Sequence, residues 1–488
     1  MRNFAAAKHN SIRYMKKVII LWMLLLAVGI IQGQESGTPL SLDSCRNLAI
    51  TGNKEMRQMD NEWQAASYER KAAFTKFLPR ISATGAYTYT SREFSLLSSE
   101  QKQALNGLGT SLAAIMPDLK GMAAPLNSVG ASLVEALHTD TRHMGLMSVM
   151  LTQPIYMGGR IAAYHRITRY AEQVAARKQD LTLQDLIVRV DEAYWQIVSL
   201  QSRKALAESY LKLTTRLDND LQQMIAQGVA TQADGLSVKV KVNEARVTLI
   251  QVNNGLELAR MLLCQLCALP LDTPIRLADE VSPDHADVPL PLHIPTADAM
   301  AHRPELNMLE LSIRIQQEKV KLARGTYLPT VSLMGGYMAS NPSVFNSFER
   351  QLKGMWNVGV MVNVPLVTFG ERRYKIRAAQ HEAKASVNQW EETREKVELQ
   401  VSQSRQRVQE AAERLQTAHR SCDEADENLR FANLGLQEGV IPVSNVIEAQ
   451  TAWLQAHAEQ VNAQIDLRLA NLYLLKSVGE IQDPRHNH

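Results

Sequence analysis

Two closely spaced cysteines, Cys264 and Cys267, are the residues of this chain most suited to chemistry. A Cys-x-x-Cys pair can cycle between dithiol and disulfide, or it can supply two thiolates to zinc. A zinc site needs further ligands, and the sequence has no second cysteine pair or nearby histidine to provide them. The chain contains an internal duplication, and the positions that match the two cysteines in its second copy are Leu475 and Val478. Because hydrocarbons fill the same places there, we interpret both cysteines as small core residues.

The other polar side chains do not indicate a catalytic centre. The 12 histidines show no ligand spacing on one face, and there is no coherent Ser/His/Asp or paired-carboxylate arrangement. The 19 methionines, among them Met144, Met147 and Met150, are more typical of flexible packing than of metal traffic. We therefore expect no enzyme activity, no cofactor and no metal.

The elements that carry these residues occur twice. Each copy has a proline, a glycine shortly after it and a second, distant glycine, and the spacing between these three marks is identical in the two copies. A Leu-Pro pair precedes the marks, Leu78-Pro79 in the first copy and Leu328-Pro329 in the second, and its distance to them is longer in the first copy. The first copy therefore contains an insertion, which belongs in a loop. The repeated marks are Pro154, Gly159 and Gly228 in the first copy, and Pro365, Gly370 and Gly439 in the second.

The segment 1–33 is typical of a secretory signal. It carries five positive charges and no acid, and its apolar run of about 14 residues is shorter than the roughly 20 that a membrane helix needs. Translation from Met15 instead of Met1 is an open alternative. Without the five charges of this segment the 53 basic residues fall to 48, against 50 acidic ones, so the chain lacks the basic surface that nucleic-acid partners require.

These observations predict five segments. Six of the 17 prolines lie between residues 270 and 295, which indicates a surface connection between the copies. The segments are a signal peptide (1–33), a first repeat (34–270), a Pro-rich connection (271–295), a second repeat (296–480) and a C-terminal tail (481–488).

Long helices with a seven-residue repeat dominate each repeat. The stretch between each pair of marked glycines covers about 69 residues, or roughly 100 Å of helix. A second helical pattern runs back after Gly228 and after Gly439, and a shorter one precedes the first strand of each copy, over residues 42–77 and 296–327. The heptad rows of the second copy, which predict coiled-coil packing, are Val401, Val408, Leu415, Cys422, Leu429 and Leu436, and Val397, Ser404, Ala411, Ala418, Ala425 and Ala432.

Short segments between the helices alternate with period two. Ile81 to Tyr89 and Trp356 to Val364 alternate clearly, whereas 147–152 and 331–340 do so more loosely. Runs of about ten residues match tilted strands that cross an outer membrane, although a half-buried sheet in a soluble domain is the alternative. Four strands are too few to close a barrel, so a membrane role requires several copies of the chain. Residues 91–145 and 341–354 are then the external loops.

Together these features resemble the TolC family of outer-membrane efflux proteins over essentially the whole mature chain. The resemblance depends on the marks Pro154 to Gly159 and Pro365 to Gly370 and on the two tip glycines. It implies an α+β membrane protein that is a homotrimer located in the outer membrane. A 12-stranded transmembrane β-barrel, with four strands from each chain, continues into a long α-helical coiled-coil barrel in the periplasm. The implied function is an exit duct for small molecules such as drugs, working with an inner-membrane transporter and a periplasmic adaptor.

The resemblance also implies site residues. The family has carboxylates six and nine residues after the second tip glycine, where this chain has Asn445 and Glu448, and an arginine two residues after it, where this chain has Ile441. The first tip keeps an acid at Asp234, and all these acids are also ordinary helix-start residues. The tips that the adaptor is expected to contact are Gly228, Val229, Ala230 and Thr231, and Gly439, Val440, Ile441 and Pro442.

Three aromatic residues, Tyr87, Tyr337 and Trp356, are candidates for the aromatic belt that contacts outer-membrane lipid, with simple barrel packing as the alternative. Metal efflux and type I protein secretion use the same architecture and remain alternatives. A secreted coiled-coil scaffold without a pore is an alternative of a different class.

Overall fold

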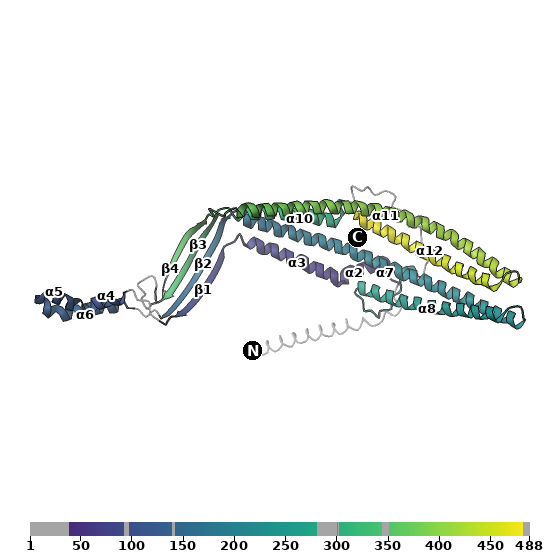
Figure 1. Ribbon diagram of the computed structural model, residues 1–488, viewed down its shortest axis with the longest axis horizontal. Coiled ribbons are helices and arrows are strands. Elements are labelled where there is room, and N and C mark those ends of the chain that lie inside the picture. The colour runs from purple at the N-terminus through teal and green to yellow at the C-terminus, as the bar shows by residue number, and fades with distance from the viewer. Residues whose placement is uncertain are drawn as a thin grey trace, which may run out of the picture. The chain divides into compact units, whose positions relative to one another are not determined.

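The computed structural model describes residues 39–91, 97–138, 142–280, 300, 302–343 and 351–481. Most of these residues are helical, and the rest include one four-stranded antiparallel sheet (Figure 1). This combination confirms the predicted class of long helices joined to four strands. The predicted signal, most of the tail and residues 281–295 of the Pro-rich connection lie outside the described residues.

The chain divides into two units. One holds the residues up to Glu62, Ala176–Met308 and the residues from Glu391 onward; the other holds Trp63–Ala175 and Leu309–Trp390. Within the described ranges, no helix is both long enough and apolar enough to cross a membrane.

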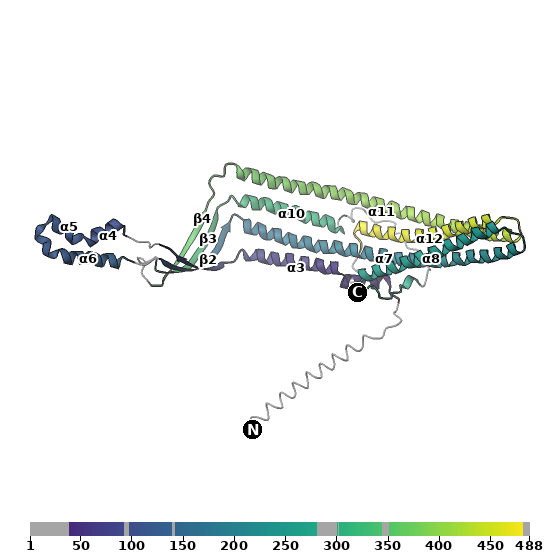
Figure 2. The same ribbon diagram turned by 60° about the horizontal axis from the view of Figure 1, so that its bottom comes forward.

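Two helices of 67 residues, one in each repeat, are the longest elements (Figures 1 and 2). At 1.5 Å per residue each is about 100 Å long. Each is followed by a shorter return helix, and each repeat also has helix before its first strand. The long helices are α7 (Arg160–Ala226) and α11 (Glu371–Gln437), the return helices are α8 (Gln232–Leu266) and α12 (Val443–Val478), and the others are α2 (Leu42–Gly52), α3 (Lys54–Thr75) and α10 (Pro304–Gly325).

The heptad rows of α11 lie on its buried face. Ten of their twelve members are buried, and the remaining two, Ser404 and Leu415, are half-buried. Alanines in one row and larger apolar residues in the other allow the neighbouring helices to approach closely. The sequence period therefore identified the face of this helix that packs.

The helix before the first strand is broken, unlike the single helix expected over residues 42–77. Asn53 has extended backbone angles, and its side-chain oxygen accepts a hydrogen bond from the Glu55 N–H at 2.8 Å. Its side-chain nitrogen donates to the Leu266 carbonyl at 3.1 Å, at the end of α8. Asn53 thus ends α2, starts α3 and ties this junction to the end of the return helix.

The four strands pair in chain order, and their register places all the predicted apolar positions on one face. Ala83, Val149, Tyr337 and Trp356 form one row across the sheet. Because side chains alternate along each strand, the other apolar positions follow on the same side. Many of the large side chains on this face are exposed. The strands are β1 (Arg80–Tyr89), β2 (His143–Met157), β3 (Thr330–Asn341) and β4 (Lys353–Asn363).

The predicted strand-to-helix marks lie directly before the long helices. Gly159 (φ +77°) precedes α7 and Gly370 (φ +89°) precedes α11, so both adopt the left-handed conformation that favours glycine. Pro154 lies at an irregularity in β2, where the register to β3 shifts between Pro154 and Tyr156. Pro365 follows the end of β4.

The insertion of the first repeat is helical, so the prediction of a loop over residues 91–145 was wrong for most of its length. Its elements are α4 (Ser99–Asn106), α5 (Leu108–Ile115), the 3-10 helix η1 (Pro117–Met122) and α6 (Ala123–Ala136), and β2 begins at His143. Within the described residues 97–138, only Gly109 and Gly130 are buried. A Cβ at Gly130 would lie 1.9 Å from the Leu105 carbonyl oxygen, so backbones meet where these glycines stand. The segment has few charges and many small residues, a composition typical of loops, and this composition led to the prediction of a loop.

Candidate functional site

The turn between α7 and α8 is the tip of the first helical hairpin. Gly228 has φ +77°, its N–H donates to the Ile225 carbonyl at 3.0 Å, and the Val229 N–H donates to the Met224 carbonyl at 2.9 Å. This pair of bonds is the Schellman pattern that satisfies the last carbonyls of a helix. Glycine is required because the left-handed conformation is costly for residues with a Cβ.

The turn between α11 and α12 has the same geometry in the second repeat. Gly439 has φ +70°, its N–H donates to the Leu436 carbonyl at 3.1 Å, and the Val440 N–H donates to the Gly435 carbonyl at 2.8 Å. Each donor and each acceptor is thus the duplicate of its counterpart in the first tip. Figures 1 and 2 show the two hairpins ending together.

The starts of the return helices differ between the tips. Thr231 caps α8, and its hydroxyl accepts from the Asp234 N–H at 3.2 Å, while the Asp234 carboxylate accepts from the Thr231 N–H at 3.1 Å. This is a complete capping box. Pro442 caps α12 without a side-chain hydrogen bond, since proline has neither a hydroxyl nor an N–H. The duplicate of Asp234 is Asn445, which therefore has no reciprocal partner of this kind.

A shared apolar cluster joins the two hairpins behind their tips. It contains Leu221 and Val238 from the first hairpin and Leu436 and Val446 from the second, with Ala230 and Ile441 packed against it. Ile441 lies over Gly435, because a Cβ there would be 3.0 Å from Ile441 Cγ1. Ile441, which stands where the resemblance implies an arginine, thus has an apolar packing role in this chain.

Two valines at the tips point to solvent. Val229 is 67% exposed and Val440 is 77% exposed, and they are duplicates of each other. Exposed apolar side chains beside a buried cluster are a common feature of docking surfaces. We call Val229 and Val440 the tip valines.

The predicted entrance residues lie within the first turns of the return helices. Asn445 and Glu448 are exposed and three residues apart, so they lie on the same side of α12. Asp234 is half-buried and its carboxylate also accepts from the Thr231 hydroxyl at 2.6 Å. The structure therefore gives Asp234 a capping contact, while Glu448 is the more exposed acid.

The candidate belt aromatics lie on the apolar face of the sheet. Tyr337 and Trp356 are directly opposite each other on β3 and β4, and Tyr337 lies over Gly354, where a Cβ would be 2.3 Å from its hydroxyl oxygen. The Tyr87 hydroxyl is 2.7 Å from His143 Nδ1. All three rings are exposed.

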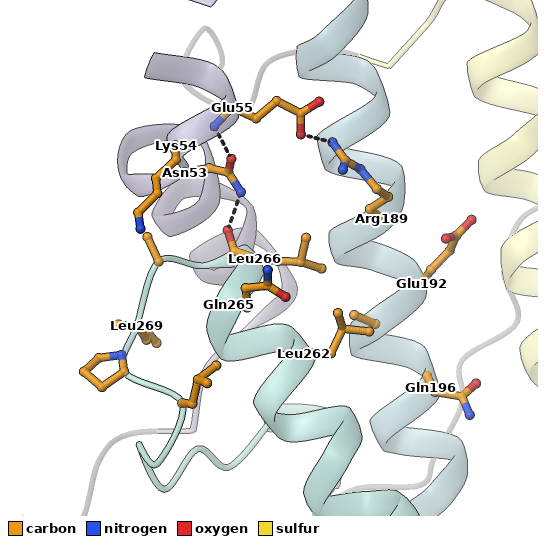
Figure 3. A pocket seen from close by; sticks show the side chains of 14 residues that line it. Asn53, Lys54, Glu55, Arg189, Glu192, Gln196, Leu262, Gln265, Leu266 and Leu269 are labelled. Atoms are coloured by element: carbon orange, nitrogen blue, oxygen red, sulfur yellow. Dashed lines mark hydrogen bonds and ion pairs between the residues drawn. The ribbon is translucent and has the colours of Figure 1, made fainter. Parts of the chain in front are cut away.

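A groove of about 980 Å³ lies beside α7 at the junction of α2, α3 and α8 (Figure 3). Glu55 and Arg189 form an ion pair at 2.5 Å across it, and Leu262 and Leu266 line its apolar side. No group of three metal-ligating side chains occurs within the residues that the structure describes. The groove therefore offers apolar surface beside one ion pair.

Two structural contacts were missed from the sequence. The capping role of Thr231 was readable from its spacing to Asp234. The bidentate pair of Arg46 and Asp191, at 2.8 and 2.5 Å, joins α2 to α7 over 145 residues of sequence. No local pattern predicts so distant a partner.

Comparisons with known proteins agree with this architecture. The profile of the family described as outer membrane efflux protein matches residues 45–268 and 296–480, one segment in each repeat. Protein CyaE of Bordetella pertussis is 25% identical over 348 residues, which cover 71% of this chain and 73% of that protein. Outer membrane protein TolC of Escherichia coli K12 is 20% identical over 349 residues, or 69% of each chain.

The crystal structure of CusC has the same fold. It matches with a TM-score of 0.72 at 14% identity, covering 92% of this chain and 95% of CusC. The family profile covers most of the chain and both of its repeats. The chain therefore belongs to the outer membrane efflux protein family, and it is an outer-membrane efflux channel.

Proposed function

We propose that three copies of this chain form the exit duct of a tripartite exporter. The observation that carries the proposal is the open sheet: among the described residues, β1 pairs only with β2 and β4 only with β3. In lipid an unpaired strand edge leaves backbone groups without hydrogen-bond partners, so the edges must pair with those of other copies. Three copies with four strands each give a 12-stranded barrel.

The helical hairpins form the periplasmic end of this duct. Chain connectivity supports that placement, because all four strands join the helices at the same end of the sheet. An inner-membrane transporter supplies small molecules such as drugs, and a periplasmic adaptor binds the tip residues 228–231 and 439–442. The exposed tip valines support this docking site. The chain moves cargo and performs no catalysis.

The entrance of the duct is lined by polar residues at the starts of the return helices. Threefold symmetry turns each exposed Glu448 into a ring of three carboxylates, with Asn445 one turn away and Asp234 at the start of the first return helix. A ring of acids concentrates negative potential in a narrow opening and favours cations there. Tyr87, Tyr337 and Trp356 contact lipid at the membrane interface.

Purification of the full chain from outer membranes tests the assembly. Native mass spectrometry in detergent is expected to give three chains in one particle, and planar bilayers are expected to show a conducting pore. A water-soluble monomer without conductance would contradict the proposal.

A deletion strain tests the cargo class. Loss of the protein is expected to lower the inhibitory concentrations of drugs while the set of secreted proteins stays unchanged. Unchanged drug susceptibility with loss of one secreted protein would instead assign the duct to protein secretion.

A further inference from the structure

Three of the four cysteines gather in one apolar core. Cys45 on α2, Cys264 on α8 and Cys267 at the end of α8 are all buried, together with residues of α7. Membership of an outer-membrane family means that this core folds in the periplasm, where disulfides form and persist. Neighbouring thiols in that compartment are candidates for oxidation.

The thiols of the Cys-x-x-Cys pair point in different directions. Cys267 Sγ lies 3.5 Å from the carbonyl oxygen of Cys45, and both residues are buried in the same apolar core. Cys264 Sγ instead lies 3.7 Å from the carbonyl oxygen of Thr273. The geometry therefore joins Cys267 to the distant Cys45 and separates it from its sequence neighbour Cys264.

We propose that Cys45 and Cys267 form a disulfide in the exported channel. The oxidant is a protein disulfide of the periplasmic thiol-oxidase class. One cysteine thiolate attacks that disulfide to give a mixed disulfide and release one thiol, and the second thiolate then attacks the cysteine sulfur and releases the other thiol. Two protons and two electrons leave the channel, and the oxidant becomes a dithiol.

The closeness of the two cysteines favours this exchange. The neighbouring Cys267 thiol lowers the pKa of Cys45, which increases the thiolate fraction of the attacking sulfur. Cys45 is 0% exposed and Cys267 is 3% exposed, so the reaction takes place while the helices are still closing around them. Once formed, the bond is shielded from reductants.

The crosslink strengthens the junction at Asn53, where α2 ends, α3 begins and the end of α8 lies alongside. Gly52 there is so close to Ala268 that a Cβ would lie 2.8 Å from the Ala268 Cβ, and Asn53 bonds the Leu266 carbonyl. The disulfide spans 222 residues of sequence, and loops of that length restrict the unfolded chain strongly. It is an intramolecular crosslink that fixes α2 to the end of α8.

Thiol trapping of the purified wild-type channel tests the proposal. Cells are quenched in acid, and the denatured protein is alkylated before and after reduction. We expect two alkylated cysteines without reductant and four with it. Tryptic digestion is expected to join the peptide that ends at Arg46 to residues 261–276, with fragmentation placing the bond at Cys267. Four free thiols before reduction, or a bond between Cys264 and Cys267, would overturn the proposal.

Variants separate the crosslink from general effects on folding. Cys264→Ser and Cys422→Ser are matched controls that are expected to keep the linked peptide, whereas Cys45→Ser and Cys267→Ser lose it. Because the folded channel shields the bond from reductants, Cys267→Ser is compared with the Cys264→Ser control. We expect amide exchange in α2 and the last turn of α8 to be at least tenfold faster in Cys267→Ser, with no change at the tips. Equal exchange in the two variants would count against a crosslink at this junction. Neither readout depends on conductance or on the number of chains, so failure here is distinct from failure of the proposed duct.

Discussion

The two hairpin tips have the same turn and different helix starts. Both turns place a glycine in the left-handed region and close with the same pair of backbone hydrogen bonds. The return helix of the first tip begins with a capping box, and that of the second begins at a proline with no side-chain bond. The same turn therefore forms with and without a side-chain cap on the helix that follows it.

That difference separates two roles which acids can have at a tip. Asp234 accepts hydrogen bonds from Thr231 and so stabilises its own helix. Glu448 is exposed on the second return helix. We expect loss of Asp234 to affect local stability and loss of Glu448 to affect ion passage.

The largest expected effect concerns the tip valines, which the two tips share. Val229→Glu combined with Val440→Glu places charge on the proposed adaptor surface, and we expect drug resistance to fall to the level of a deletion strain. Inhibitory concentrations measure this, and blots of outer-membrane fractions check that the channel is still present there. Gln223→Glu, on the exposed side of α7 near the first tip, is the matched control. Full drug resistance in the double variant would show that the tip valines are not part of the docking surface.

Gly228→Ala and Gly439→Ala test whether the two turns are equivalent. No atom lies within 4 Å of a Cβ built at either glycine, so the cost arises from backbone strain alone. We expect each change to cost about 1–2 kcal/mol locally, which amide exchange at the tip would show as roughly a five- to thirtyfold acceleration. Asparagine tolerates the left-handed region and is the control expected to restore most of the protection. A clear difference between the tips would show that the apolar cluster supports one turn more than the other.

Substitutions at the third residue of each return helix, Asp234 in α8 and Asn445 in α12, test the difference between the two caps. Asp234→Ala is expected to destabilise the start of α8 by about 0.5–1 kcal/mol, while Asn445→Ala leaves α12 nearly unchanged. The double change Pro442→Thr and Asn445→Asp installs the capping box in the second tip and is expected to slow exchange there. Equal losses at both tips would contradict the assignment of Asp234 as a capping residue.

Glu448→Gln gives the smallest expected effect. It removes one charge from each chain at nearly constant shape, so we expect a modest loss of cation preference and weaker block by multivalent cations in bilayer recordings. Glu438→Gln, another exposed acid at the second tip, is the control. Identical selectivity in both variants and the wild type would leave Glu448 as an ordinary helix-start acid.

Much of the fold was predictable because the physics that sets it is local and periodic. The row of Val401, Val408 and Leu429 in α11 is spaced by sevens, and a helix converts that spacing into a buried face. Gly228 and Gly439 each follow a long helical pattern, and a glycine at that place is typical of the turn that ends a helix. The alternation around Tyr337 and Trp356 likewise gave the sheet face correctly.

The remaining features depend on contacts between distant parts of the chain. The break at Asn53 is stabilised by the carbonyl of Leu266, which lies in the return helix at the other end of the first repeat. The role of Ile441 depends on Gly435, whose lack of a side chain leaves room for it. Asp234 looked like an entrance acid by resemblance, although its spacing to Thr231 already allowed the capping box that the structure shows.

The helical insertion of the first repeat has a practical consequence. Because only two glycines of residues 97–138 are buried, little of the free energy that holds the sheet together comes from this segment. The second repeat joins its strands with far fewer residues between Asn341 and Lys353. Strand pairing therefore tolerates connections of different length, which makes residues 97–138 a natural place to graft an epitope or affinity tag.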